Sequence, residues 1–238
     1  VIVPKWATDG GFEAMCGRLK NLSDKLKAEI ADELESRGGP ESVLITSGHG
    51  KGLEFEGKRL SQIMDKYGIS AVDSAIKVLM ETDGAASCCY FSLSEKDVED
   101  ILKEVFIAVG TDGYALSFGN DFIKNSMHPR SFGTFPKYFE LIREKKLLSL
   151  EDAVYKVSGL PAQILGIKNS GLLLPGMAAD ITVFDYANIR DNADYINSAV
   201  KPQGIKYVVI GGKIALSNGE QAGENTGKVI FHGQQLNS

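Results

Sequence analysis

The sequence predicts an α/β protein that ends in a small antiparallel sheet, and two observations carry this prediction. Over roughly the first 168 residues, apolar residues recur at helical spacing in several segments, which alternate with short apolar runs typical of strands. After about Gly171 the helical period is lost, and strand-like runs are joined by glycine turns. We therefore expect α/β units over residues 1–168 and a separate β domain over residues 169–238.

The first third of the chain is helical in pattern. Leucine and isoleucine recur at helical spacing from Leu19 to Leu34, and Gly38-Gly39-Pro40 ends the run. Val43-Leu44-Ile45-Thr46 then has the composition of a short strand. Two amphipathic stripes follow, one over residues 60–67 and one over residues 72–80. These patterns predict a short strand among helices.

Three serines mark helix starts further along the chain. Each has an aspartate three residues on, the spacing at which a side-chain oxygen accepts from the first helical amides. The pairs are Ser70 with Asp73, Ser94 with Asp97, and Ser149 with Asp152.

One apolar run leads directly into an acidic turn. Phe106-Ile107-Ala108-Val109 predicts a buried strand, and Gly110-Thr111-Asp112-Gly113 predicts a sharp exit that carries a carboxylate. In parallel α/β architectures, catalytic groups lie at the carboxyl ends of strands. Asp112 is therefore a candidate catalytic residue. The downstream segment from Met127 to Pro136 is too polar for a core and predicts a loop.

The last 70 residues contain several strand signals. Residues 180–185 and 206–210 have strand composition, and Gly211-Gly212 can take the positive φ angles of a two-residue hairpin that leads into residues 213–216. Val229-Ile230-Phe231 closes the series as a last predicted strand.

Composition excludes several classes of protein. The net charge of −5 gives no basic surface for nucleic acid. No apolar run approaches the ~18 residues that cross a bilayer, and the first residues lack a signal-peptide pattern. We therefore expect a cytoplasmic protein with no nucleic-acid or membrane partner. Because the chain begins at Val1 without an initiator methionine, we also expect it to be a fragment.

The residues alone leave the chemistry of the polar segment open. The three histidines, His49, His128 and His232, show no spacing typical of a zinc site. Arg130 has two equally weighted interpretations. It can clamp a substrate carboxylate with parallel hydrogen bonds, or it can form a salt bridge with Asp112 or Asp121.

Several motifs resemble the C-terminal half of the N-acyl-D-amino-acid deacylases (D-aminoacylases), a branch of the amidohydrolase superfamily. The most specific is His128-Pro129-Arg130-Ser131-Phe132-Gly133-Thr134-Phe135-Pro136, which follows Gly110-Thr111-Asp112-Gly113. The glycine-to-aspartate pattern of residues 176–185 is shared by many amidohydrolases. The resemblance covers most of the chain from about Phe91 onward, and residues 48–93 are similar to an insertion that these enzymes carry over the active site.

The resemblance implies a fold and a set of site residues. The fold is the C-terminal part of a metal-dependent-hydrolase (β/α)8 barrel over residues 1–168, with a helical insertion at about 48–93, plus a small antiparallel β-sandwich domain over residues 169–238. Asp112 matches the family's last-strand aspartate, a metal ligand and catalytic acid/base. Arg130 matches the arginine that receives the substrate carboxylate, and Leu93 stands where the family usually has a methionine lining the acyl pocket.

The implied reaction is the zinc-dependent hydrolysis of an N-acyl-D-amino acid, a small-molecule substrate, to a carboxylate and a D-amino acid. Zinc lowers the pKa of bound water toward ~7 and polarises the amide carbonyl. Asp112 takes the water's proton and hands it to the departing amine, while Arg130 fixes the amino-acid end.

The chain departs from the family in its metal ligands. The family's H-x-H pair, its cysteine and its other histidine ligands lie on earlier strands, and none of them is present in this sequence. Only Asp112 remains of the zinc site. We therefore expect the N-terminal half of the barrel to be the partner of these residues, in the same polypeptide or in a second chain. Alone, the 238 residues are expected to be inactive.

Two other functions stay open. The first is another amidohydrolase, such as a dihydroorotase-like or hydantoinase-like cyclic amidase, although Arg130 in its H-P-R context argues against it. The second is a non-catalytic module that kept the fold and lost the metal site. An H-x-H motif upstream of Val1 would favour an enzyme, and its absence would favour the module.

Overall fold

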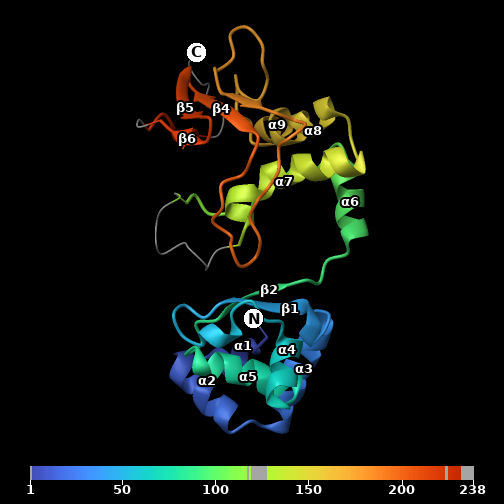
Figure 1. Cartoon of the computed structure of the whole chain (residues 1–238), viewed down its shortest axis with the longest axis vertical. Coiled ribbons are helices and arrows are strands. Elements are labelled where there is room, and N and C mark those ends of the chain that lie inside the picture. The colour runs from blue at the N-terminus through green and yellow to red at the C-terminus, as the bar shows by residue number, and fades with distance from the viewer. Residues whose placement is uncertain (1, 117, 119–127, 223–224, 232–238) are drawn as a thin grey trace. The chain divides into compact units, whose positions relative to one another are not determined.

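The computed structural model describes residues 2–116, 118, 128–222 and 225–231 (Figure 1). The chain divides into two compact units. Unit 1 comprises residues 1–93, 119–128 and 194–198, and unit 2 comprises residues 94–118, 129–193 and 199–238. Each unit has its own cluster of buried apolar side chains. Of the helices within the described ranges, none is long and apolar enough to span a bilayer.

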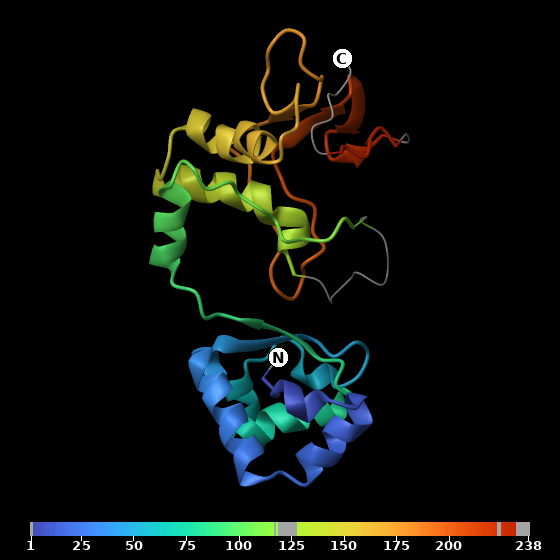
Figure 2. The same ribbon diagram turned by 180° about the vertical axis from the view of Figure 1, so that it is seen from behind.

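Unit 1 combines helices with a two-stranded antiparallel sheet that lies along one edge of the unit (Figure 2). Leu44 of the first strand lies opposite Cys89 of the second. The first strand is buried along its whole length, and Val43 and Ile45 belong to the apolar cluster of this unit. The elements are α1 (Lys5–Thr8), α2 (Gly11–Lys20), α3 (Asp24–Ser36), β1 (Val43–Ser47), α4 (Leu60–Tyr67), α5 (Ala71–Glu81) and β2 (Ser87–Tyr90), with short 3₁₀ turns at Pro40–Ser42 and Leu53–Phe55.

The predicted helical run from Leu19 to Leu34 is two helices, not one. The helix α2 ends at Lys20, and Ser23 begins α3 by accepting a hydrogen bond from the amide of Leu26 at 3.2 Å. A serine oxygen can replace the carbonyl that the first helical amides lack, so the chain restarts a helix here instead of continuing one.

Unit 2 combines helices with a four-stranded antiparallel sheet. The strands follow one another in the order β3-β4-β5-β6, as in a meander. Between them, Val183 pairs with Tyr207, and Val209 pairs with Ile214. The elements are α6 (Glu95–Lys103), α7 (Arg130–Lys145), α8 (Leu150–Val157), α9 (Gly159–Ile164), β3 (Ile181–Phe184), β4 (Ile205–Ile210), β5 (Lys213–Ser217) and β6 (Glu220–Gln221).

The core of unit 2 is centred on α7. Tyr138, Phe139 and Ile142 are buried on one face of this helix. The ring of Phe139 lies 4.9 Å from that of Phe184 in β3, measured between centroids, so the helix packs directly on the sheet domain. Arg143 adds two hydrogen bonds, from its Nη1 atom to the carbonyl oxygens of Tyr186 and Ile189, at 2.7 and 2.9 Å.

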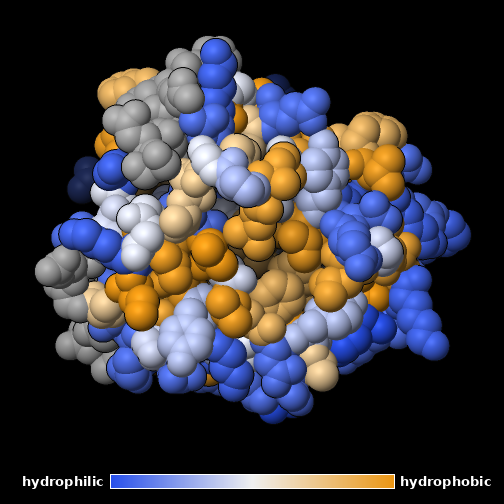
Figure 3. Space-filling view, turned by 90° about the horizontal axis from the view of Figure 1, so that it is seen from above, coloured by the Kyte–Doolittle hydropathy of each residue, from blue (hydrophilic) through white to orange (hydrophobic). Residues whose placement is uncertain are grey.

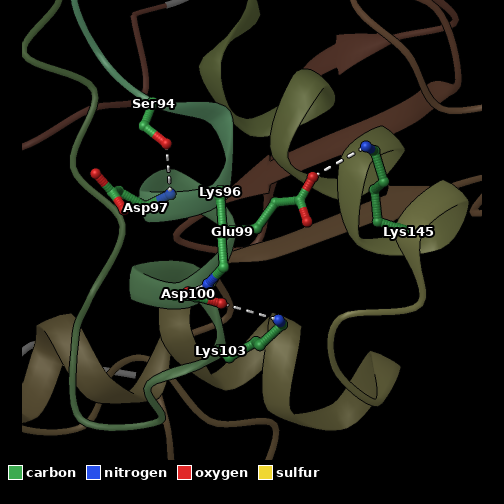
Figure 4. A network of polar contacts seen from close by, with 7 residues as sticks. All are labelled: Ser94, Lys96, Asp97, Glu99, Asp100, Lys103 and Lys145. Atoms are coloured by element: carbon green, nitrogen blue, oxygen red, sulfur yellow. Dashed lines mark hydrogen bonds and ion pairs between the residues drawn. The ribbon is translucent and has the colours of Figure 1, made fainter.

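Polar contacts fix the beginning of α6 and attach the helix to α7 (Figure 4). Ser94 caps α6 by accepting from the amide of Asp97 at 3.3 Å, and Glu99 forms an ion pair with Lys145 of α7 at 2.9 Å. None of the residues of α6 is buried. The helix is therefore attached to unit 2 by this ion pair and by Leu102, which is partly buried against the core.

Predictions based on short-range chemistry are confirmed. Ser70 and Ser149 accept from the amides of Asp73 and Asp152 at 3.1 Å each, as Ser94 does for Asp97. Gly211-Gly212 has φ angles of 56° and 78° and joins β4 to β5. Both motifs require only neighbouring residues, so no distant part of the chain is needed to form them.

Two predicted strands do not form in the structure. Residues 106–109 belong to no strand, and Phe106 is 69% exposed instead of buried. Residues 229–231 likewise form no strand. A strand is stabilised by its neighbours' hydrogen bonds, and both sheets among the described residues are antiparallel, so no parallel strand accompanies residues 106–109.

Candidate functional site

Asp112 lies in an irregular segment, residues 107–116, and its side chain is exposed to solvent. The side chain is 87% exposed, and the residue has a φ angle of 46°, a conformation that aspartate adopts more readily than most residues. The amide of Gly113 donates to Oγ1 of Thr111 at 3.2 Å. This internal hydrogen bond supports the turn that presents the carboxylate.

The turn packs closely against the first turn of α7. A Cβ atom on Gly113 would lie 2.8 Å from the Cα atom of Ser131, closer than real Cβ contacts allow. The amide of Tyr114 also donates to Oγ of Ser131 at 3.2 Å. Glycine at position 113 therefore allows two backbone segments to touch, and this contact sets the distance between Asp112 and α7.

Arg130 begins α7 and reaches the acidic turn. Its Nη2 atom lies 3.1 Å from Oδ2 of Asp112, and its side chain is 42% exposed. Of the two interpretations of Arg130, the structure contains the salt bridge with Asp112. Asp121, the other proposed partner, lies outside the described residues. An ion pair this exposed is worth only about 0–1 kcal/mol.

The polar segment around Arg130 is helical, which corrects the predicted loop. The helix starts at Arg130 directly after Pro129, and Pro136 lies inside it in a buried position. Proline inside a helix removes one hydrogen bond and usually breaks the helix. Here the buried face of α7, which includes Pro136 and Phe139, supplies the compensating apolar contacts.

Gly133 provides a second close approach on α7. A Cβ atom at this position would lie 2.2 Å from the carboxylate of Asp191. The carboxylate accepts from the amide of Ala193 at 3.0 Å, and burial raises the pKa of Asp191 above its ordinary value of 3.8. Gly133 therefore allows α7 to pack closely against Asp191, which follows β3.

Leu93 belongs to unit 1, whereas Asp112 and Arg130 belong to unit 2. Its side chain is 82% exposed, next to the serine that caps α6. Its predicted role in an acyl pocket stays a prediction.

The histidines have partners other than a metal where they are described. Nε2 of His49 lies 3.0 Å from Oγ of Ser87. The ring of His128 packs edge-on against that of Tyr195, with 5.1 Å between the ring centroids. His232 lies outside the described residues. Across the described ranges, no group of three His, Cys, Asp or Glu side chains is arranged to hold a metal ion.

Sequence reasoning missed Lys156, which lies in α8 near the segment leading to Asp112. Its side chain is almost completely buried, and Nζ donates to the carbonyl oxygen of Leu102 at 2.6 Å and to that of Glu104. Burial lowers the pKa of this lysine. The available signal was its spacing, because Lys156 follows the buried Ala153 by three residues and so shares its helix face.

Comparison with known proteins identifies similar sequences and structures. The profile of the Amidohydrolase family matches residues 30–215. The N-acyl-D-aspartate deacylase of Alcaligenes xylosoxydans xylosoxydans is 33% identical over 185 residues, which cover 77% of this chain and 34% of that protein. A dihydroorotase of Lactobacillus gasseri is 35% identical over only 79 residues, 32% of this chain and 17% of that protein.

Two solved structures share the fold over part of their length. An N-acyl-D-glutamate deacylase from Bordetella bronchiseptica, in complex with zinc and a phosphonate that mimics the tetrahedral intermediate, has a TM-score of 0.61 and 28% identity over 76% of this chain and 36% of that chain. A D-aminoacylase has a TM-score of 0.66 and 27% identity over 90% of this chain and 46% of that chain. The chain spans about a third of the length of the deacylase sequences that it matches.

Gly113→Ala is expected to separate the acidic turn from α7, because the new methyl group would overlap the backbone of Ser131. Hydrogen–deuterium exchange of the Tyr114 amide in the 238-residue chain should become faster by roughly tenfold or more, since its hydrogen bond to Ser131 opens more often. Gly110→Ala is the matched control, because nothing lies within 4 Å of that Cβ position. Equal exchange rates in the two variants would contradict the assigned role of Gly113.

Proposed function

The chain belongs to the Amidohydrolase family, and from this premise we propose that it supplies the C-terminal half of a zinc-dependent N-acyl-D-amino-acid deacylase. Such an enzyme hydrolyses the amide bond of its substrate to a carboxylic acid and a free D-amino acid. The observation that carries the proposal is the pairing of Asp112 with Arg130, which unites a proton-transfer group with a carboxylate-binding group. Their separation of 3.1 Å places both groups within reach of one small molecule.

The described residues do not make a zinc site by themselves. Zinc sites in enzymes need about three protein ligands, and no such group of side chains exists in the ranges that the structure describes. Asp112 offers one exposed carboxylate. We therefore propose that the other ligands come from the N-terminal half of the barrel. When bound there, zinc would polarise the amide carbonyl and activate water.

Asp112 is proposed as the group that moves the proton. An exposed carboxylate can accept a proton from water and return it to the leaving nitrogen, provided that it lies within hydrogen-bond distance of both. The hydrogen bond between Gly113 and Thr111 and the packing of Gly113 on α7 hold the backbone that carries the carboxylate. A fixed position matters because proton transfer depends first on geometry and only then on acidity.

Arg130 is proposed to bind the carboxylate of the substrate. A guanidinium has five donors in a planar fork and pairs with carboxylates through two parallel hydrogen bonds. The ion pair with Asp112 does not prevent this role, because an exposed pair contributes at most about 1 kcal/mol. A substrate carboxylate can therefore displace Asp112 at little cost, which would also release Asp112 for proton transfer.

Exposed apolar residues support the proposal that a further segment covers unit 2. Val98 and Ile101 of α6 and the adjacent Val105 and Phe106 are all exposed. Apolar side chains also gather on the face of the molecule seen in Figure 3. Large exposed apolar patches mark interaction surfaces. We propose that the N-terminal half of the barrel packs on the exposed apolar residues of α6 and on Val105 and Phe106.

In the complete enzyme, we propose that residues 1–168 contribute to the barrel and its insertion, and residues 169–238 to the sandwich domain. Leu93 would then line the pocket for the acyl group. Its branched aliphatic side chain suits an apolar acyl chain, and its exposure leaves room for one.

A cyclic amidase is the second candidate, because dihydroorotases match part of the sequence. That match covers 32% of this chain, whereas the N-acyl-D-aspartate deacylase covers 77%. A panel of N-acyl-D-amino acids and cyclic amides, assayed with the complete enzyme, separates the two. A non-catalytic module would hydrolyse neither class.

Asp112→Ala in the complete enzyme is expected to lower kcat by roughly 10²-fold to 10⁴-fold, because one group would serve both proton transfers. Release of the D-amino acid is the measured signal. The matched control is Asp83→Ala, which removes another exposed, ion-paired aspartate with a positive φ angle. Turnover near that of the wild type in Asp112→Ala would refute the assignment.

Arg130→Lys is expected to raise KM by about 10-fold to 100-fold and to change kcat much less, since an ammonium cannot reproduce the two parallel hydrogen bonds. Steady-state kinetics on the preferred substrate measure both constants. Arg190→Lys serves as the control, because Arg190 makes a similar forked contact with Gln203 in unit 2. A loss confined to kcat would be inconsistent with a substrate-binding role.

A further inference from the structure

A buried lysine connects α8 to the segment that precedes Asp112. The side chain of Lys156 is 1% exposed. Its Nζ atom donates to the carbonyl oxygens of Leu102 and Glu104, at the point where α6 ends. Carbonyl groups at the end of a helix lack helical partners and carry partial negative charge, so a cation is well suited to this position.

The backbone of the same lysine holds the other end of the segment. The carbonyl oxygen of Lys156 accepts from the amide of Val109 at 3.2 Å. Residues 104–109 therefore form a loop whose two ends are both fastened to one residue of α8. Val109 lies three positions before Asp112, and Tyr114, two positions after it, is bonded to Ser131 of α7.

We propose that Lys156 is a positioning residue for Asp112, acting by fixing both ends of the segment that carries the chain from α6 into the acidic turn. The inference rests on the proposed function of Asp112 and deepens it. Lys156 touches neither substrate nor reacting atoms. It acts by limiting where the turn can lie.

The energetics favour a specific role over simple packing. Burying an ammonium is costly, and burial lowers the pKa of Lys156 as a result. An apolar side chain of similar length would fill the same space without this cost. It would lack the ability to donate to the two carbonyl groups, so both would lose the lysine as a donor, and Glu104 would keep only the amide of Ile107.

Residues 104–109 have few other contacts that would hold them. The segment belongs to no strand, and Phe106 is exposed, although Val109 packs against the core of unit 2 and the amide of Ile107 donates to the carbonyl oxygen of Glu104 at 3.2 Å. Lys145 also attaches α6 to its surroundings, but through the side chain of Glu99 (Figure 4). Lys145 thus provides a matched lysine that contacts α6 without contacting the segment.

The test compares Lys156→Met with Lys145→Met in the complete enzyme. We expect Lys156→Met to lower kcat by about 10-fold to 100-fold, with KM within about twofold, because a small displacement of a catalytic group costs rate more than binding. Lys145→Met should keep both constants near those of the wild type. Equal losses in the two variants, a parallel rise in KM, or an unchanged kcat in Lys156→Met would overturn the proposal.

A second measurement does not depend on the folding of Lys156→Met. In the 238-residue chain, the Val109 amide should exchange with solvent much more slowly than its intrinsic rate, and it should stay protected in Lys145→Met. Lys156→Arg, which keeps the buried cation, should retain kcat within about threefold. Unprotected exchange at Val109 in the wild type, or inactive but folded Lys156→Arg, would overturn the proposal. If Asp112→Ala remains active while the Val109 amide is protected, the proposed function of Asp112 is refuted. The hydrogen bond between Val109 and Lys156 is then still supported.

Discussion

Gly113 lets the backbone after Asp112 lie against the first turn of α7, and the geometry of the candidate site depends on this contact. A Cβ atom there would come within 2.8 Å of Ser131. The ion pair between Asp112 and Arg130 is a consequence of the contact and not its cause, because an exposed pair contributes at most about 1 kcal/mol. Backbone packing therefore sets the positions of the two charged groups.

The helix that carries Arg130, α7, also joins the candidate site to the core of unit 2. Phe139 packs on Phe184 of the sheet, and Arg143 bonds to the carbonyl groups of Tyr186 and Ile189. The sheet domain therefore supports the site through α7, although it contributes neither Asp112 nor Arg130. Before Asp112 in the sequence, Lys156 binds both ends of residues 104–109 through its side chain and its backbone carbonyl group. The Asp112 turn is thus fixed by α7 at one end and by α8 at the other.

The sequence predicted the parts of the fold that short-range chemistry determines. The cap at Ser149 and the Gly211-Gly212 hairpin need only their neighbours, and both form as expected. The strand at residues 106–109 does not form, because a strand requires a partner that composition cannot supply. The helical state of Arg130 was also not predictable, since prolines usually end helices and only the packing around Pro136 compensates. At the site, the salt bridge was one of two open alternatives, and the buried Lys156 was missed.

We propose that this chain holds one part of a divided metal site. Zinc titration of the isolated 238 residues by calorimetry, repeated on the complete enzyme, would test this proposal. We expect no stoichiometric, tight binding by the isolated chain, because Asp112 is a single ligand. We expect tight binding by the complete enzyme, and weaker binding in its Asp112→Ala variant. Stoichiometric, tight zinc binding by the isolated chain would contradict it.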